Sequence, residues 1–216
     1  MNIFTQICKK SILSIVLGAS ALTGFAADIP LSGQGTETSP YLIGSVNDLR
    51  QIVAYMLTNK ATMQGSYLSL TSDIDLTGVE FTPIGEFDGC FDGQGHIIKG
   101  ISYTTTASYQ GVFTTIGTKG SVKNLTLKGT ITSDNTYTGG FTGTLKGSID
   151  NCVNQIDINS TKTNTAGFAA KAISGSSLSK CVNQAEITSS MGNLAGIVSD
   201  SESGVSYTEC GNTGVI

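Results

Sequence analysis

Residues 139–152, GGFTGTLKGSIDNC, contain two short segments that decide the fold, because both recur along the chain at a nearly constant spacing. Copies of the first segment end at Phe113, Phe141, Phe168 and Ile197, which are 28, 27 and 29 residues apart. Copies of the second segment end at Leu125, Cys152, Cys181 and Cys210, which are 27, 29 and 29 residues apart. Two markers with one period of about 28 residues predict a repeat protein in which each set of residues forms one column.

Further positions keep the same period and show what kind of structure repeats. Two more columns are predicted at Leu127, Asn154, Asn183 and Asn212, and at Ile131, Ile158, Ile187 and Ile216. Within each repeat, apolar residues alternate over short runs that are separated by Gly, Ser, Asn and Asp, which is typical of strands and turns. The odd step between Ile149 and Cys152 predicts a corner at Asn151 that keeps both flanking side chains inward.

These patterns predict an all-β fold, a right-handed parallel β-helix with an N-terminal capping α-helix. A coil of this length holds three short strands, and coils stacked about 4.8 Å apart bury a continuous core that no single coil can form. The handedness follows the general preference of parallel connections. A β-propeller needs about 40–50 residues per blade and a leucine-rich repeat needs a Leu-rich consensus, so neither is favoured.

Residues 1–26 are predicted to be a secretory signal peptide. Lys9 and Lys10 precede an uncharged apolar run at residues 11–22, and small residues lead to a cleavage site after Ala26. The apolar run is too short to span a bilayer permanently. We therefore expect an exported chain, secreted or at the cell surface, with no integral membrane segment after signal removal.

The remaining chain divides into residues 27–66, an N-terminal strand and capping helix, and residues 67–216, the coils. Ser45 and Asp48 form a capping-box pattern at the start of a helix predicted over residues 45–58. Its apolar face consists of Leu49, Ile52, Val53, Met56 and Leu57. We expect this helix to cover the first coil.

Residues 40–43 and 67–70 are predicted to be the strands on either side of that helix. At the other end of the stack, the sequence reaches Ile216 with no helix or polar strand that would cover the last coil. Since exposed strand edges invite pairing, we expect either edge-to-edge association through this coil or continuation in a longer array.

Charge and composition exclude some classes of partner. The formal net charge is −4, and removal of Lys9 and Lys10 with the signal peptide changes it to −4 − 2 = −6. A mildly acidic chain without a basic cluster argues against binding to nucleic acid or to an anionic membrane.

The ionisable residues do not form a recognisable catalytic or metal-binding motif. His96 is the only histidine, so a zinc peptidase with its two helical histidines is excluded and a Ser-His-Asp triad is not favoured. Asp73 and Asp75 are too few for a calcium loop. Asp88 and Asp92 each precede a glycine, as turn residues commonly do. We predict no catalytic, cofactor-binding or metal-binding residues.

An alternative of a different class is a carbohydrate-active β-helix enzyme of the polysaccharide lyase or hydrolase type. It would use Asp88 or Asp92 with Lys99 as a base, and glycoside hydrolysis would need two carboxylates about 5–9.5 Å apart.

The cysteines are interpreted as structural. Cys8 is removed with the signal peptide, and Cys152, Cys181 and Cys210 are predicted to stack inward beneath Leu125 as small apolar residues. Export permits oxidation, but aligned side chains suit stacked thiols better than the disulfide dihedral, and the pairing stays open. Cys90 lies outside this column.

Two other groups of residues are either structural or contacts to a ligand. The asparagine column at Asn154, Asn183 and Asn212 is predicted to form a buried hydrogen-bonded ladder. Three tyrosines offer faces for stacking on sugars if they point outward, although single aromatic residues on strands more often pack. They are Tyr103, Tyr109 and Tyr137.

The chain resembles the GLUG-motif family over about residues 33–216. The resemblance rests on residues 35–43, 72–76, 81–85 and 87–98, and on Gly140-Phe141-Thr142-Gly143, which matches the motif itself. It implies a right-handed parallel β-helix of secreted or surface bacterial proteins, found in adhesin-like proteins and beside immunoglobulin A-cleaving metallopeptidases. No catalytic residue set belongs to that module, so none is transferred to this chain.

The sequence therefore predicts a secreted or cell-surface, non-enzymatic module with an adhesin-like binding role or a scaffold role. The expected partner is a glycan or a host or cell-surface protein. The alternatives are the carbohydrate-active enzyme and an accessory fragment of a larger surface protein.

Overall fold

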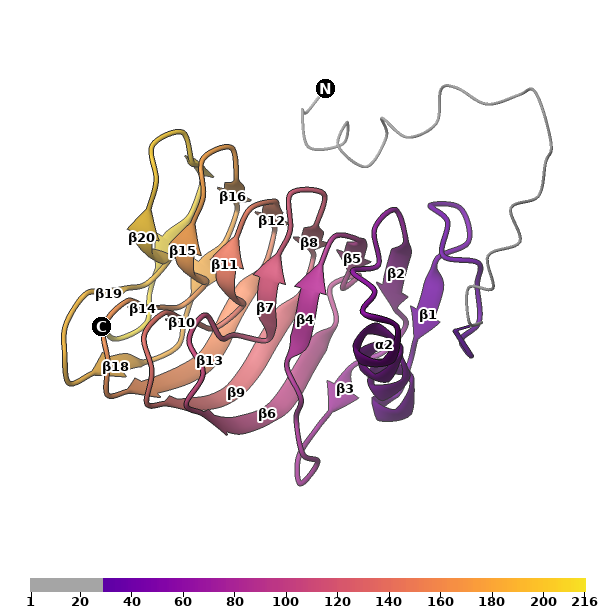
Figure 1. Ribbon diagram of the computed structural model, residues 1–216, viewed down its shortest axis with the longest axis horizontal. Coiled ribbons are helices and arrows are strands. Elements are labelled where there is room, and N and C mark those ends of the chain that lie inside the picture. The colour runs from indigo at the N-terminus through magenta and orange to yellow at the C-terminus, as the bar shows by residue number, and fades with distance from the viewer. Residues whose placement is uncertain (1–28) are drawn as a thin grey trace.

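The computed structural model describes residues 29–216, which form a β-solenoid whose coils follow one another along the long axis of the molecule (Figure 1). Every ladder between its named strands is parallel. The predicted all-β solenoid with a helix near the N-terminus is confirmed. The predicted signal peptide, residues 1–26, and Cys8 lie outside the described residues.

The strands form four sheets that run along the stack. Sheet 1 contains β1 (Tyr41–Ile43), β2 (Tyr67–Leu70), β5 (Cys90–Asp92), β8 (Ser121–Lys123), β12 (Ser148–Asp150), β16 (Ser177–Ser179) and β21 (Ser206–Thr208). Sheet 2 contains β3 (Ile74–Asp75), β6 (Ile97–Thr105), β9 (Thr126–Ser133), β13 (Val153–Ser160), β17 (Val182–Asn183), β18 (Ile187–Ser189) and β22 (Gly211–Asn212). Sheet 3 contains β4 (Ile84–Phe87), β7 (Phe113–Ile116), β11 (Thr142–Leu145), β15 (Ala169–Ala172) and β20 (Val198–Ser201). Sheet 4 contains only two-residue strands, β10 (Thr138–Gly139), β14 (Thr165–Ala166) and β19 (Leu194–Ala195). The later coils thus have this short fourth stretch in addition to the three strands predicted.

The helix, α2 (Val46–Asn59), packs against β1 and β4 at the N-terminal end of the stack. The Ser45 side chain caps it by accepting a hydrogen bond from the Asp48 N–H at 3.2 Å, as the capping-box pattern predicted. Its buried face consists of Leu49, Ile52, Val53 and Met56. Leu57 was wrongly predicted to belong to this face, because its side chain is 59% exposed at the helix end.

The corner between sheet 1 and sheet 2 is built from one residue per coil in the left-handed backbone region. Asn151 has φ 51°, and both Ile149 and Cys152 beside it are fully buried, so the predicted corner is confirmed. The Asn151 side-chain amide also donates to the Asn124 side chain of the preceding coil at 2.8 Å. Asn tolerates this backbone region better than most residues do, which explains its presence at the turn.

The predicted phenylalanine column is interrupted at its first member. Phe141 stacks on Phe168 with ring centroids 4.7 Å apart, but Phe113 pairs in register with Thr142 and packs instead against Phe87 at 5.5 Å. The two coils differ by one residue in the segment between two paired positions. Gln110 pairs with Thr138, and Phe113 pairs with Thr142. The earlier coil therefore advances three residues between these pairs, whereas the later coil advances four.

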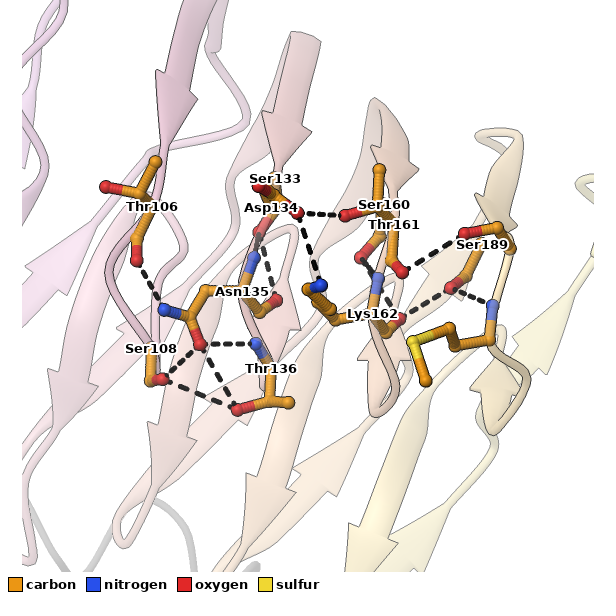
Figure 2. A network of polar contacts seen from close by, with 12 residues as sticks. Thr106, Ser108, Ser133, Asp134, Asn135, Thr136, Ser160, Thr161, Lys162 and Ser189 are labelled. Carbon is orange, nitrogen blue, oxygen red and sulfur yellow. Dashed lines mark hydrogen bonds and ion pairs between the residues drawn. The ribbon is translucent and has the colours of Figure 1, made fainter.

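The corner after sheet 2 is held by a column of hydroxyl groups, shown in part in Figure 2. In four successive coils a Ser or Thr side chain accepts a hydrogen bond from the main-chain N–H two residues later, which closes a local turn. These residues are Thr105, Ser133, Ser160 and Ser189. The corner is joined from coil to coil by Asp134, which accepts from the Thr161 hydroxyl and lies 3.6 Å from the Lys162 amine.

Candidate binding surface

The acidic residues considered as catalytic candidates each have their own local partners. The Asp73 carboxylate accepts hydrogen bonds from the Ile97 N–H at 3.1 Å and from the His96 imidazole at 3.0 Å, which lower its pKa in that order of importance. Hydrogen bonds from Thr77 and then from Lys99 lower the pKa of Asp75 to about 2. The Lys99 amine lies 3.2 Å from this carboxylate at an exposed position.

Of the second pair of acids, Asp92 is held within its own turn, as the sequence predicted, whereas Asp88 is held by the next coil. The Asp92 side chain accepts from the Gln94 N–H and the Asn124 amide, both at 2.9 Å, and lies 3.1 Å from the Lys123 amine. The Asp88 carboxylate accepts from the Lys119 N–H of the next coil at 3.2 Å. Each carboxylate therefore has its own set of partners.

His96 and the metal-ligating residue types also show structural contacts. Within residues 29–216, the His96 imidazole is bonded to Asp73 and no Ser or Thr hydroxyl is bonded to it. In the same part of the chain, no group of three or more His, Cys, Asp or Glu side chains is placed to hold a metal ion.

The cysteine column is present, with its last member at the end of the stack. Cys152 and Cys181 are fully buried and Cys210 is half-buried, and all three are thiols in the structure. A hydrogen bond from the Cys181 thiol lowers the pKa of Cys210, whereas this hydrogen bond and burial raise the pKa of Cys181. Cys90 is buried in β5, outside this column.

Cys210 should therefore be alkylated by iodoacetamide at a lower pH than an ordinary thiol, whose pKa is about 8.5. Since the thiolate is the nucleophile, a lowered pKa moves the rise of the labelling rate to lower pH. Labelling followed by peptide mass spectrometry across a pH series would measure this rise. The same chain unfolded in urea is the control, and identical pH profiles for Cys210 in the two states would contradict the prediction.

The three tyrosines differ in their surroundings. Tyr103 packs against Phe81 at 5.5 Å and its hydroxyl donates to the Gly111 carbonyl at 2.9 Å, and burial raises its pKa. Tyr109 is 41% exposed and stacks on the partly exposed Tyr137, with ring centroids 4.5 Å apart and 10° between the ring planes. Tyr109 and Tyr137 are thus the exposed aromatic pair that the sequence left open, and Tyr103 is a packing residue.

This pair occupies a backbone position that disfavours tyrosine. One residue per coil before sheet 4 has φ between 57° and 65°, and these residues are Tyr109, Tyr137, Asn164 and Asn193. The left-handed region costs most non-glycine residues about 1–2 kcal/mol, and Asn is one of the few that visit it readily. The two later coils use Asn, whose side chains hydrogen-bond to each other, whereas the two earlier coils place aromatic rings there.

The loop that carries Tyr109 lies unusually close to sheet 3. A Cβ atom at Gly143 would lie 2.0 Å from the carbonyl carbon of Tyr109, so only glycine allows the loop to approach sheet 3 so closely. The next coils have Ala170 and Ser199 at the corresponding position, although the loop one coil before Ala170 carries Tyr137. The glycine is therefore required by the close approach of the Tyr109 main chain and not by a tyrosine side chain. Backbone strain at an exposed aromatic residue makes this position a candidate for binding.

Charged side chains on sheet 3, and one that directly follows it, lie beside the rings. The Tyr137 hydroxyl donates to the Asp200 carboxylate at 3.2 Å, and the Lys171 amine lies 3.6 Å from both Asp200 and Glu202. Partial burial and then the Asp200 charge raise the pKa of Tyr137, and Asp200 raises the pKa of Lys171. We name Tyr109, Tyr137, Lys171, Asp200 and Glu202 the tyrosine platform. It combines aromatic surface with fixed donors and acceptors.

No helix within residues 29–216 has both the length and the apolar character needed to cross a membrane. No protein-family model matches the chain. Over 133 residues the chain is 35% identical to a "Putative Gly-rich membrane protein" of Evansella cellulosilytica, a match that covers 55% of this chain and 15% of that protein. Over 134 residues it is 30% identical to halomucin of Haloquadratum walsbyi, which covers 55% of this chain and 1% of that protein.

Among solved structures, the chain is similar to one described as a "putative immunoglobulin A1 protease from Bacteroides ovatus". The two chains are 20% identical with a TM-score of 0.53, and the likeness covers 83% of this chain and 77% of the other. At this identity the likeness shows the fold alone. The chain is thus a β-solenoid that corresponds to a small part of its sequence relatives and to most of a solved structure.

Proposed function

We propose that this chain is an exported, cell-surface binding module without enzymatic activity, and that the tyrosine platform binds glycans. The observation that carries the proposal is the exposed Tyr109–Tyr137 stack at a strained corner where the next two coils use Asn. Tyrosine is a side chain that protein surfaces use for binding, because it offers a rigid apolar face and a polar end. Lys171, Asp200 and Glu202 supply the donors and acceptors that sugar hydroxyls require.

The surface location is supported by several independent features. The sequence predicts a signal peptide at residues 1–26, and one relative is named as a membrane protein. We also propose that the chain is related to the surface proteins with GLUG motifs that it resembles. The small share of the relatives that this chain covers supports a role as one module among others. An adhesin-like role fits these features. If no ligand binds, the chain is instead a purely structural scaffold.

The non-enzymatic part of the proposal is supported by the separate partners of the candidate catalytic groups. Asp92 is paired with Lys123, Lys99 with Asp75, and Asp88 with a main-chain N–H of the next coil. A polysaccharide lyase or hydrolase would need these groups to act on one substrate. Release of products from common polysaccharides incubated with the chain would contradict this part of the proposal.

The test of the binding site is a glycan array followed by titration of the strongest ligand. Tyr109→Ala and Tyr137→Ala should each raise Kd at least about tenfold, since the loss of one stacking face is worth about 1.4 kcal/mol. The matched control is Tyr207→Ala, because Tyr207 is 45% exposed but lies in β21, on sheet 1. A silent array, or equal losses for all three variants, would reject the tyrosine platform as the site.

A further inference from the structure

The coil that contains β3 and β4 is shorter than the next one, and the missing residues leave part of β6 without a strand beside it. Ile74 pairs with Ile98, and Ile84 pairs with Phe113. The earlier coil therefore uses 84 − 74 = 10 residues where the later one uses 113 − 98 = 15. The chain leaves sheet 2 after β3 and crosses directly to β4, five residues short of a full coil.

As a result, the C-terminal half of β6 has a strand on one side only. β9 pairs along β6 from Ile97 to Thr105, but β3 pairs with it only at Ile98 and Lys99. No other described strand pairs with residues 102–105 on the side away from β9. Within residues 29–216, this edge lies along the stack and not at either of its ends.

The main-chain groups on this open side can be identified. The Thr105 carbonyl accepts from the Asp134 N–H at 3.0 Å, and the Ile101 carbonyl faces Gly129, so these residues direct their groups toward β9. Because successive residues of a strand direct their N–H and C=O groups to opposite sides, Ser102 and Thr104 direct theirs away from β9. Within residues 29–216, no hydrogen bond to the main chain of Ser102 or Thr104 is formed from that side.

A cavity of about 390 Å³ lies along this edge. It is lined by residues 80–83, by residues 102–105 of β6 and by Gln110. Phe81 and Tyr103, with ring centroids 5.5 Å apart, contribute the apolar part of a mostly polar lining, and Glu80 adds an exposed carboxylate. The cavity therefore occupies the place where a full coil would have continued its strand.

We infer that this cavity binds an extended peptide segment of another protein, which adds a short strand to the open edge of β6. Unpaired N–H and C=O groups on a strand edge are a template for another chain, and peptide addition to such edges is a common mode of recognition. A peptide main chain repeats its donors and acceptors at the spacing that Ser102 and Thr104 present, whereas a glycan does not. One apolar side chain of the peptide would face Phe81 and Tyr103, and a basic side chain would lie near Glu80.

The probe is a synthetic library of capped hexapeptides that alternate Thr and Val and carry one Lys at a varied position, tested against the purified chain by fluorescence anisotropy. Thr104→Pro should weaken the best peptide at least tenfold, because proline removes the N–H that faces the cavity. It should barely change the melting temperature, since proline is tolerated at an edge position whose N–H is not in the ladder.

The matched control is Thr132→Pro in β9, at the position paired with Thr104. The Thr132 N–H faces β6, in the ladder that includes the Asp134 N–H, so this variant should melt at a much lower temperature. Equal destabilisation by both prolines would show that the Thr104 N–H is not free for a ligand. A library without any binder, or binding unchanged by Thr104→Pro, would also overturn the inference.

The peptide site and the tyrosine platform are separable in this experiment. Tyr109→Ala together with Tyr137→Ala should leave peptide affinity within twofold, because neither tyrosine lines the cavity. Displacement of the peptide by a glycan from the array would identify the cavity as a sugar site and would reject the peptide.

Discussion

Replacing Asn183 by Ala should lower the free energy of unfolding by about 3 kcal/mol, because it opens a buried chain of amide hydrogen bonds. The Asn183 amide donates to the Asn212 side chain at 2.7 Å and to the Ala185 carbonyl at 3.1 Å. Its carbonyl oxygen accepts from the Asn154 amide at 2.7 Å. Asn154 and Asn183 are both fully buried, so no water replaces the bonds that the substitution removes.

The size of the effect follows from the partners that remain. An N–H of Asn154 and the carbonyl of the buried Ala185 would each lose a partner, at about 1–3 kcal/mol per unsatisfied buried group. The backbone is also fitted to this side chain, since a Cβ atom at Gly167 would lie 2.4 Å from the Asn183 oxygen. Urea unfolding followed by circular dichroism would measure the loss.

Asn212→Ala is the matched control, because it removes the same side chain from the exposed end of the ladder. There water can satisfy the Asn183 amide, and we expect a loss below about 1 kcal/mol. Equal losses at the two positions would show that burial of the ladder does not determine its contribution.

The sequence is most informative where one residue type repeats at one place in the coil. The asparagine column, the corner at Asn151 and the stacked cysteines depend on local spacing, and the structure places each of them as the spacing indicates. The hydroxyl column also has a signal, since Thr105, Ser133, Ser160 and Ser189 are spaced by 28, 27 and 29 residues. It was missed because Ser and Thr are common in every turn of this chain.

Features that depend on the count of residues between paired positions could not be predicted. Phe113 and Phe141 are 28 residues apart, as the period requires, yet Phe113 pairs with Thr142 because one coil has an additional residue before its strand. The open edge at Ser102 and Thr104 arises in the same way, from a coil that is five residues short. These differences in the number of residues per coil can be recognised only once the hydrogen-bonded pairs between strands are known.

The candidate site was only partly visible in the sequence for a different reason. Tyr109 and Tyr137 are separated by one period, which predicts that they are neighbours, but a period does not say on which side of the wall a ring lies. Their exposure depends on the left-handed backbone at both residues, and Asp200 joins them from a strand 63 residues later in the sequence. Tyr103 lies in a regular strand, where alternation directs its ring inward.

Replacing Phe168 by Ala should cost more stability than any other single truncation proposed for this chain, about 3–5 kcal/mol. Its ring is fully buried and stacks on Phe141, so the substitution removes a large apolar surface and leaves a cavity between two coils. The coils hold each other by contacts with their direct neighbours, so such a cavity cannot be filled by movement within one coil.

Ile197→Ala is the control for the stability lost in Phe168→Ala. It tests whether that loss depends on the closed interior between two coils or would follow from shortening any apolar side chain of the column. Ile197 follows Phe168 in the same column, but it is only partly buried because its coil is the last of the stack. We expect a loss of about 1 kcal/mol there.

The double variant Phe141→Ala with Phe168→Ala should lose less stability than the sum of the two single variants. The difference should be about 0.5–1.5 kcal/mol, the coupling typical of an aromatic pair. Strict additivity, or a Phe168→Ala loss no larger than that of Ile197→Ala, would mean that the rings fill the interior without supporting each other across the coils.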